Sequence, residues 1–266
     1  MQHLFQSWET HSAHLRAAVH ILLLSDYDGT LTPIVSRPDE AILPPNVRGT
    51  LRALAEKPRF SVGIISGRSL SEIKGMVEIE GIYYGGNHGL EIEGPGLRFT
   101  NPAARTAQTV IKDLAEQLSD RLGSIKGVIV EDKGLSLSVH YRLVKESEEN
   151  AVAEVVRQIT SPWLSDGKIK VTTGKKVWEV RPPIDWDKGK AVETIRKEIK
   201  LLLKQAQLLT IYLGDDTTDE DAFRVISHPQ GLSIFVGQEN DLSNADYFLN
   251  STLEVETFLS RLLELK

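Results

Sequence analysis

The chain has 266 residues, of which 41% are hydrophobic and 26% are charged, as is usual for a folded globular protein. Its formal net charge of −6 argues against a general nucleic-acid binder, and the lack of cysteine excludes disulfides, thiolate nucleophiles and cysteine-based zinc sites. No apolar run approaches the roughly 18 residues of a membrane span, so we expect no membrane partner. The N-terminal stretch lacks the pattern of a signal peptide, and a cysteine-free chain suits a reducing compartment. We therefore expect a cytoplasmic protein, and we expect it to act as a monomer.

Strands and helices are predicted to alternate at both ends of the chain, after a polar N-terminal helix. The strands are short apolar runs of the kind buried on both faces of a sheet, at 20–25, 60–67, 208–216 and 232–237, and the stretch 82–92 gives a further strand and then a glycine-rich turn. The helices that separate or follow them are expected at 44–57, from 69 onward, and at 189–204, 218–226 and 253–265. This alternation predicts an α/β fold with a Rossmann-like parallel sheet and helices on both faces.

The middle of the chain changes character and predicts an inserted α+β domain. Its helices are expected at 101–122 and 146–160, and each is followed by a pair of half-polar strands, at 127–142 and 168–181. The first pair should turn at Lys133-Gly134 and the second at Thr173-Gly174. This order favours an antiparallel sheet with helices on one face. We expect a core of residues 1–102 and 183–266, and an inserted domain of residues 103–182.

Four of the predicted strands end in polar, glycine-rich turns. The turns are Asp26-Tyr-Asp28-Gly-Thr30, Ser66-Gly-Arg68-Ser69, Gly85-Gly-Asn87-His88-Gly89 and Gly214-Asp215-Asp216. Because ligands of open α/β sheets bind beyond the carboxyl ends of the strands, these turns should meet at one edge. Asp26, Asp28 and Asp215 could there share a hard cation, and Mg2+ prefers oxygen ligands of this kind. Any one of these aspartates could instead cap a helix, but two acidic turns after buried strands favour the metal site.

These turns also resemble the motifs of the haloacid-dehalogenase (HAD) superfamily. DYDGTLTPI, which begins at Asp26, is similar to the first motif, DxDGT. Ser66 in IISGR, Lys188 in WDKGKA and the acidic run GDDTTDEDAF resemble the second, third and fourth motifs, in the same order. The insertion lies between the second and third motifs, as in members with a larger cap. The resemblance implies a HAD core with a cap domain and Mg2+-dependent phosphatase chemistry.

The mechanism implied by this resemblance gives each motif a role. Asp26 would attack the phosphorus and form an aspartyl-phosphate, while Asp28 would protonate the leaving alcohol and then activate water. Lys188 and Ser66 would stabilise the phosphoryl group. Asp26, the backbone carbonyl of Asp28, and Asp215 would bind Mg2+.

Several residues near these motifs keep more than one interpretation. Asp216 and Asp219 would support the metal ligands or orient Lys188. Three further lysines compete with Lys188 for the phosphate, and only the family pattern favours Lys188; they are Lys175, Lys176 and Lys190. Ser66 by itself could cap a helix.

Strand alternation in the inserted domain places polar side chains of both charge signs on one side of the predicted sheet. Glu131 and Lys133 share a side of one strand, and Lys175 and Glu179 share a side of another. A solvated sheet face would look similar, but a sugar also needs mixed donors and acceptors. We leave His140 out of the site, because a histidine in a sheet more often packs than binds.

The motifs ExK, HYR and GKxVxEVRP, together with GDDxTDEDAF, resemble the trehalose-6-phosphate phosphatases. This resemblance implies a sugar-phosphate substrate whose hydroxyls are bound by Glu131, Lys133 and Glu179. It implies that Arg142 and Lys175 reach the phosphate end from the cap. The residues implied for the core side of the pocket are Arg68, Asn87 and His88.

Other functions remain as alternatives. A phosphatase of the same superfamily could act on sucrose phosphate or a mannosyl-phosphoglycerate, and a non-catalytic sensor could bind sugar phosphates on the same fold. Intact Asp26 and Asp28 argue against the sensor, which needs no nucleophile. A serine hydrolase is disfavoured because Ser66 lies in GxxSG and not in GxSxG, and the P-loop pattern of kinases is missing.

Overall fold

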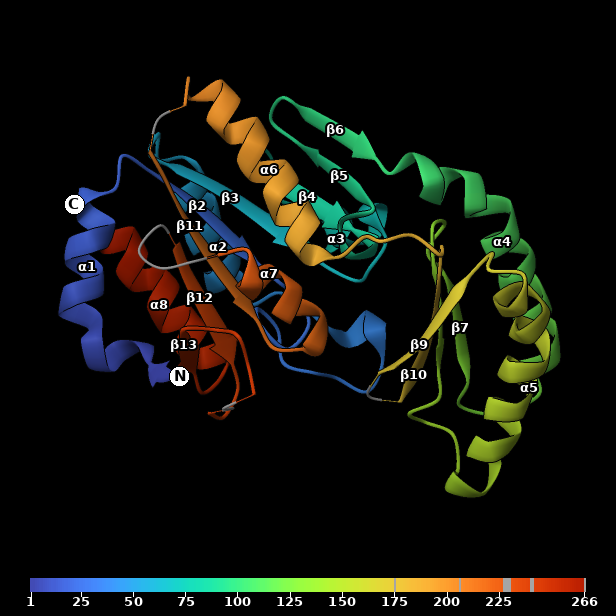
Figure 1. Ribbon diagram of the computed structural model, residues 1–266. Helices are drawn as coiled ribbons and strands as arrows, with labels where there is room; N and C mark the ends of the chain where they lie inside the picture. The colour runs from blue at the N-terminus through green and yellow to red at the C-terminus, as the bar shows by residue number, and fades with distance from the viewer. Residues whose placement is uncertain (175, 206, 227–230, 240–241, 266) are drawn as a thin grey trace. The chain divides into compact units, whose positions relative to one another are not determined.

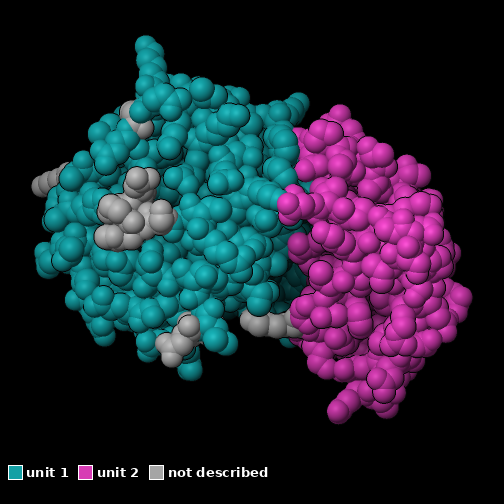
Figure 2. All heavy atoms as spheres, in the orientation of Figure 1, with its two compact units in different colours: residues 1–99, 186–266 teal, residues 100–185 magenta. Residues whose placement is uncertain are grey.

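The computed structural model describes residues 1–174, 176–205, 207–226, 231–239 and 242–265. These residues form two compact units, Met1–Phe99 with Trp186–Lys266, and Thr100–Asp185 (Figure 2). The second unit corresponds to the inserted segment expected at 103–182, and its status as an independent domain stays a prediction. Within the described residues, no helix is both long enough and apolar enough to cross a membrane.

The first unit is built on a mainly parallel sheet, which has nine strands among the described residues (Figure 1). Each strand pairs in parallel with its neighbour from β1 at one edge of the sheet, through β13, β12, β11, β2 and β3, to β4. The next strand, β5, runs antiparallel to β4. In spatial order they are β1 (Gln2–His3), β13 (Tyr247–Leu249), β12 (Gly231–Val236), β11 (Leu208–Gly214), β2 (His20–Ser25), β3 (Phe60–Ile65), β4 (Tyr83–Gly86), β5 (Glu91–Gly94) and β6 (Leu97–Thr100).

Helices cover both faces of this sheet, which confirms the predicted fold class (Figure 1). One face packs against α1 (Trp8–Ala17), α2 (Pro45–Ala55), α3 (Leu70–Val77) and α8 (Thr252–Glu264), and the other against α6 (Lys188–Leu202) and α7 (Glu220–Arg224). Successive residues of β2 therefore enter different cores: Leu23 packs on the first face and Leu24 on the second. Burial on both faces explains why the strand is an uninterrupted apolar run.

In this unit one predicted helix was wrong in extent, and several strands were missed. The strand and glycine-rich turn expected within 82–92 are present as β4 and the turn at Asn87–Gly89, where Asn87, His88 and Gly89 have positive φ values of 51°, 57° and 84°. The antiparallel strand β5, which follows this turn, was missed. The helix expected at 218–226 is the short α7, preceded by a 3-10 turn at Thr217–Asp219. The short strands β1 and β13 were missed, because segments of two or three residues are too short to show a hydrophobic periodicity.

The second unit has the predicted antiparallel sheet with helices on one face. Its sheet order is β7-β8-β10-β9, and every pairing is antiparallel. The helices pack on Leu137, Val139 and Val180, from one side of the sheet. The turn expected at Thr173-Gly174 was misplaced, because β9 continues through both residues. The elements are α4 (Pro102–Leu122), β7 (Ile129–Asp132), β8 (Leu137–His140), α5 (Glu146–Ser165), β9 (Lys170–Gly174) and β10 (Val177–Arg181).

Candidate active site

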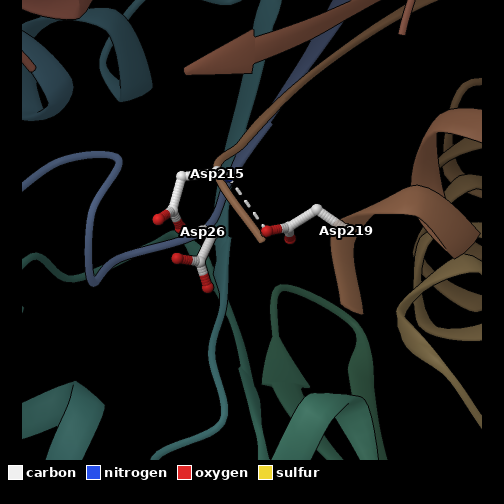
Figure 3. A group of neighbouring side chains, drawn as sticks. All are labelled: Asp26, Asp215 and Asp219. Atoms are coloured by element: carbon white, nitrogen blue, oxygen red, sulfur yellow. Dashed lines mark hydrogen bonds between the residues drawn. The ribbon is translucent and has the colours of Figure 1, made fainter. Parts of the chain in front are cut away.

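The parallel strands β2 and β11 bring Asp26 and Asp215 to the same edge of the sheet. The backbone N–H of Asp26 donates to the carbonyl of Leu213 at 2.8 Å, which extends the β2–β11 pairing by one residue. Asp215 follows the last residue of β11. Each of Asp26, Asp215 and Asp219 offers a carboxylate oxygen, and these three oxygens lie within 4.8 Å of one another (Figure 3). Three acidic groups this close repel one another unless positive charge lies among them.

Gly29 allows the carboxylate of Asp215 to lie against the turn that carries Asp26 and Asp28. Its φ of +89° lies in the left-handed region, and its N–H donates to the carbonyl of Thr32 at 2.7 Å. Any side chain at this position would overlap the Asp215 carboxylate. The glycine of the DxDG pattern is thus needed both for the turn and for the approach of Asp215.

Lys188, the first residue of α6, supplies positive charge to this cluster. Its Nζ donates to Oδ1 of Asp26 and to Oδ1 of Asp219, both at 2.7 Å, and all three residues are buried. Burial alone would lower the pKa of Lys188, but the carboxylates of Asp219 and Asp26 outweigh it and raise the pKa above its usual value. The ammonium therefore stays charged, and it lies against the carboxylate expected to attack phosphorus.

Asp219 is saturated by hydrogen bonds. Oδ1 accepts from Lys188 and from the hydroxyl of Tyr212 at 2.7 Å, and Oδ2 accepts from the backbone N–H groups of Asp215 and Asp216 at 3.1 and 3.0 Å. A carboxylate has about four lone-pair sites, and four donors occupy them here. Asp219 therefore holds Lys188 and the turn after β11 in place, and is a poor candidate for a metal ligand. Asp216 accepts from Thr217 N–H and caps the following 3-10 turn.

The electrostatics of the cluster fit a hard divalent cation. Burial raises the pKa of Asp26 well above its usual range; Lys188 opposes this, and Asp219, Asp215 and Asp28 add to it. Three carboxylates around one ammonium carry a net charge of −2, which a divalent cation would balance. The available donors are oxygens, as Mg2+ prefers. The residues present therefore fit a Mg2+ ion beside Asp26 and Asp215.

Arg68 joins the turn after β3 to the turn after β2. Its Nε and Nη2 donate to the two carboxylate oxygens of Asp28 at 2.8 and 2.7 Å, and further donations go to Glu72 and to the carbonyl of Pro38. Burial alone would lower the pKa of Arg68, but Asp28 and Glu72 raise it. The guanidinium thus fixes the direction of the Asp28 carboxylate. The acid–base role of Asp28 and the substrate role of Arg68 stay predictions.

Ser66, Asn87 and His88 belong to one hydrogen-bonded assembly of the turns after β3 and β4. The N–H of His88 donates to the Ser66 carbonyl at 2.8 Å, and that of Asn87 to the Arg68 carbonyl at 2.7 Å. The Ser66 hydroxyl accepts from Arg68 N–H at 3.2 Å. The positive φ values of Asn87 and His88 are costly for residues with side chains, and such strain clusters at functional sites. Their roles toward substrate stay predictions.

In the second unit, the predicted sugar-binding residues line the polar side of the sheet. Cross-strand pairing places Glu131 opposite Ser138, Ser138 opposite Glu179, and Glu179 opposite Thr172, which forms one row across four strands. Glu131 contacts Lys133, whose Nζ is 3.7 Å away and whose side chain is nearly buried. Arg181 donates to Glu179. Carboxylates held by cations, with hydroxyls between them, form a surface that could bind a sugar.

Three other residues of this unit were weighed as substrate-binding candidates: Arg142, Lys175 and His140. Arg142 is exposed just after β8. Lys175 lies outside the described residues. His140, which sequence reasoning set aside, contacts Glu131 through Nε2 at 2.9 Å. The signal for His140 was its spacing two residues from Ser138, which puts both on the same side of β8.

The fold, with an acidic site at the carboxyl edge of its sheet, is that of the haloacid dehalogenase-like hydrolases. A haloacid dehalogenase-like hydrolase from Bacteroides thetaiotaomicron has the same fold, with a TM-score of 0.62 over 91% of this chain and 99% of that chain at 16% identity. The trehalose-6-phosphate phosphatase C-terminal domain of Candida albicans aligns with a TM-score of 0.78 over 97% of each chain at 24% identity. The sequence profile of the trehalose-phosphatase family matches residues 24–252. The chain belongs to the trehalose-phosphatase family.

Sequence relatives agree with this assignment. Trehalose-phosphate phosphatase B of Arabidopsis thaliana is 37% identical over 256 residues, covering 92% of this chain and 67% of that protein. The trehalose-phosphate phosphatase of Mycobacterium marinum is 43% identical over 243 residues, covering 89% of this chain and 60% of that protein. The chain spans about two thirds of the length of the curated relatives it matches. The predicted family is confirmed, and phosphoric monoester hydrolysis is the class of activity of that family.

Proposed function

We propose that this chain hydrolyses trehalose 6-phosphate to trehalose and inorganic phosphate, with Mg2+ and through an aspartyl-phosphate on Asp26. The observation that carries the proposal is the buried Asp26 carboxylate, which contacts the Lys188 ammonium at 2.7 Å and lies beside Asp215. This arrangement occurs in a chain of the trehalose-phosphatase family.

The chemistry takes two steps. Oδ of Asp26 attacks phosphorus in line while the bond from phosphorus to the sugar oxygen breaks, and Asp28 gives its proton to that oxygen. A water molecule then attacks the phosphorus of the aspartyl-phosphate while Asp28 takes its proton. The bond from phosphorus to Asp26 breaks and releases phosphate. Lys188 and Ser66 stabilise the negative charge of the phosphoryl group.

The metal site that we propose consists of the carboxylates of Asp26 and Asp215 and the backbone carbonyl of Asp28. Its support is the cluster's net charge of −2 and the close approach of Asp215 to Gly29. Asp219 is left out because four donors already occupy its oxygens. Bound Mg2+ supplies positive charge that offsets the repulsion between a carboxylate nucleophile and a phosphate.

The substrate-binding residues that we propose are those implied by the family resemblance. Glu131, Lys133 and Glu179 bind the hydroxyls of the disaccharide, which is supported by the polar row that spans the second sheet. The other substrate-binding residues are Arg142, Lys175, Arg68, Asn87 and His88. The partner is a small sugar phosphate, and we further propose a monomer that binds no nucleic acid. A cysteine-free chain is suited to the cytoplasm, where we place it.

The test is phosphate release from trehalose 6-phosphate, glucose 6-phosphate and sucrose 6-phosphate, in Mg2+ or in EDTA, for wild type and Asp26→Asn. We expect Mg2+-dependent release that strongly prefers trehalose 6-phosphate and is lost in the variant. A preference for another sugar phosphate would retain Asp26 and overturn the substrate. No release from any of the three would favour a non-catalytic sensor.

A further inference from the structure

Tyr212 is a buried phenol in β11, a strand whose side chains are mostly apolar. It lies in β11, whose sequence is LLTIYLG, and its ring packs edge-on against Phe223 of α7 with 5.8 Å between centroids. The ring belongs to the apolar cluster between the sheet and the helices α6 and α7. A phenylalanine would fill this space equally well, so the hydroxyl calls for its own explanation.

The hydroxyl of Tyr212 leads through two side chains to the nucleophile. It donates to Oδ1 of Asp219 at 2.7 Å, and the same oxygen accepts from Nζ of Lys188 at 2.7 Å. Nζ also donates to Oδ1 of Asp26 at 2.7 Å. None of the four residues is more than 5% exposed, so water does not screen these contacts.

The phenol is a permanent donor in this arrangement. Burial raises the pKa of Tyr212 well above its usual value, and the negative charges of Asp219 and Asp26 raise it further. Both effects favour the protonated phenol, which is the form that donates the hydrogen bond to Asp219.

The remaining surroundings of Asp219 leave its carboxylate little freedom. Oδ2 is held by two backbone N–H groups, and the carboxylate lies directly against the backbone of Gly214, where any side chain would overlap it. Asp219 therefore cannot turn toward a new partner if one donor is removed. A change in the charge on its oxygens therefore acts on Lys188, which donates to Oδ1.

We propose that Tyr212 is a positioning residue that sets how the ammonium of Lys188 is shared between Asp219 and Asp26. An oxygen that accepts a strong hydrogen bond from the phenol attracts a second donor less, so Lys188 stays midway. Without the hydroxyl, Asp219 draws the ammonium away from Asp26 and from the phosphoryl group. The inference rests on the proposed function in one respect, that Asp26 is the nucleophile.

This role affects the chemical step and not substrate binding. Tyr212 and Asp219 have no part in the proposed sugar contacts, so KM should hardly change when the hydroxyl is removed. The loss should appear in kcat, because the charge on Lys188 acts on the transferring phosphoryl group. The factor by which kcat falls should be the same for a disaccharide phosphate and for p-nitrophenyl phosphate, which has no sugar.

The experiment compares Tyr212→Phe with Tyr84→Phe, the same change at another buried tyrosine of the sheet. The Tyr84 hydroxyl donates to the carbonyl of Ile79 at 2.7 Å, away from the acidic cluster. Both variants are assayed on trehalose 6-phosphate and p-nitrophenyl phosphate in saturating Mg2+, well below their measured Tm. For Tyr212→Phe we expect kcat to fall about 10- to 100-fold and KM to stay within about twofold, as for one hydrogen bond to a charged group. For Tyr84→Phe we expect a lowered Tm and kcat within about twofold of wild type.

The proposal is overturned if Tyr212→Phe retains wild-type kcat, or if both variants lose kcat in proportion to Tm. Failure of the proposed function is recognised separately. Wild type that cleaves p-nitrophenyl phosphate but not trehalose 6-phosphate refutes the substrate, and the role of Tyr212 is then decided on the aryl phosphate. Wild type that cleaves neither refutes both proposals.

Discussion

Replacement of Lys188 by methionine tests the charge balance of the acidic cluster most directly. The change keeps the apolar stem of the side chain and removes the ammonium that joins Asp26 to Asp219. Two carboxylates then face each other in a buried site without the cation that lay between them. Asp219 keeps three of its donors, whereas Asp26 loses the contact that opposes the effect of burial on its pKa.

The expected cost is large, because breaking a buried ion pair leaves an uncompensated charge. Removal of one partner from such a pair typically costs about 3 to 5 kcal/mol of unfolding free energy. Lys188 is 2% exposed and contacts two carboxylates at 2.7 Å, so solvent screening does not reduce this figure. Phosphate release should be lost as well, since the ammonium contacts Asp26, the proposed nucleophile.

The matched control is Lys190→Met, two residues further along α6. Lys190 is half-buried, and its substitution should cost less than about 1 kcal/mol. Urea unfolding of both variants in EDTA gives the two free energies, and phosphate release in Mg2+ gives the activities. Equal stability of Lys188→Met and wild type would refute the reasoning. So would a loss of activity in Lys190→Met that matches the loss in Lys188→Met.

Three further outcomes follow from the structure. Glu179→Ala should abolish the preference for trehalose 6-phosphate in kcat/KM yet leave turnover of p-nitrophenyl phosphate; equal loss on both would contradict the division of roles. Gly29→Ala should raise the Mg2+ concentration needed for half-maximal activity at least about tenfold. The added methyl group overlaps the Asp215 carboxylate, and the φ of +89° is unfavourable for alanine. An unchanged Mg2+ dependence would show that Asp215 is not a ligand. Burial raises the pKa of Tyr83 to about 12, and the charge of Glu198 adds to this effect. The protonated phenol therefore favours folding below pH 10, and up to about 3 kcal/mol of this contribution to the unfolding free energy is lost as the pH rises to 12. In the Tyr83→Phe variant, the unfolding free energy should decline less steeply with pH than in wild type. Urea unfolding of both proteins from pH 9 to 11 measures the two slopes, and equal slopes would contradict the prediction.

The catalytic core was the more predictable part of the molecule. The run at β2 is apolar at every position and ends in Asp26, and the run at β11 ends in Asp215, so pattern and parallel pairing together predict that the two meet. Motif resemblance added Lys188 and chose it over Lys190 and Lys176. In the structure Lys188 contacts Asp26, whereas Lys176 pairs with Glu149.

The arrangement within the turns was not predictable to the same degree. The glycine-rich turn at 85–89 was predicted, but the sequence did not show that Asn87 and His88 adopt positive φ values or that the antiparallel strand β5 follows them. The hydrogen bonds from Arg68 to Asp28 could not be predicted from the sequence either, because the two residues lie 40 positions apart. His140 was set aside because a histidine in a sheet more often packs than binds, and the pairing of β7 with β8 brings it into contact with Glu131.

The sequence by itself determined which residue types stand at the ends of the buried strands, because apolar runs, glycines and acidic turns are local patterns with local physical causes. Only the tertiary structure decided how their charges are shared. The sequence left Asp219 either to support the metal ligands or to orient Lys188, and the structure shows its oxygens filled by Lys188, Tyr212 and two backbone N–H groups. Hydrogen bonding of a buried carboxylate depends on donors from three segments of the chain, and their meeting is a property of the folded sheet.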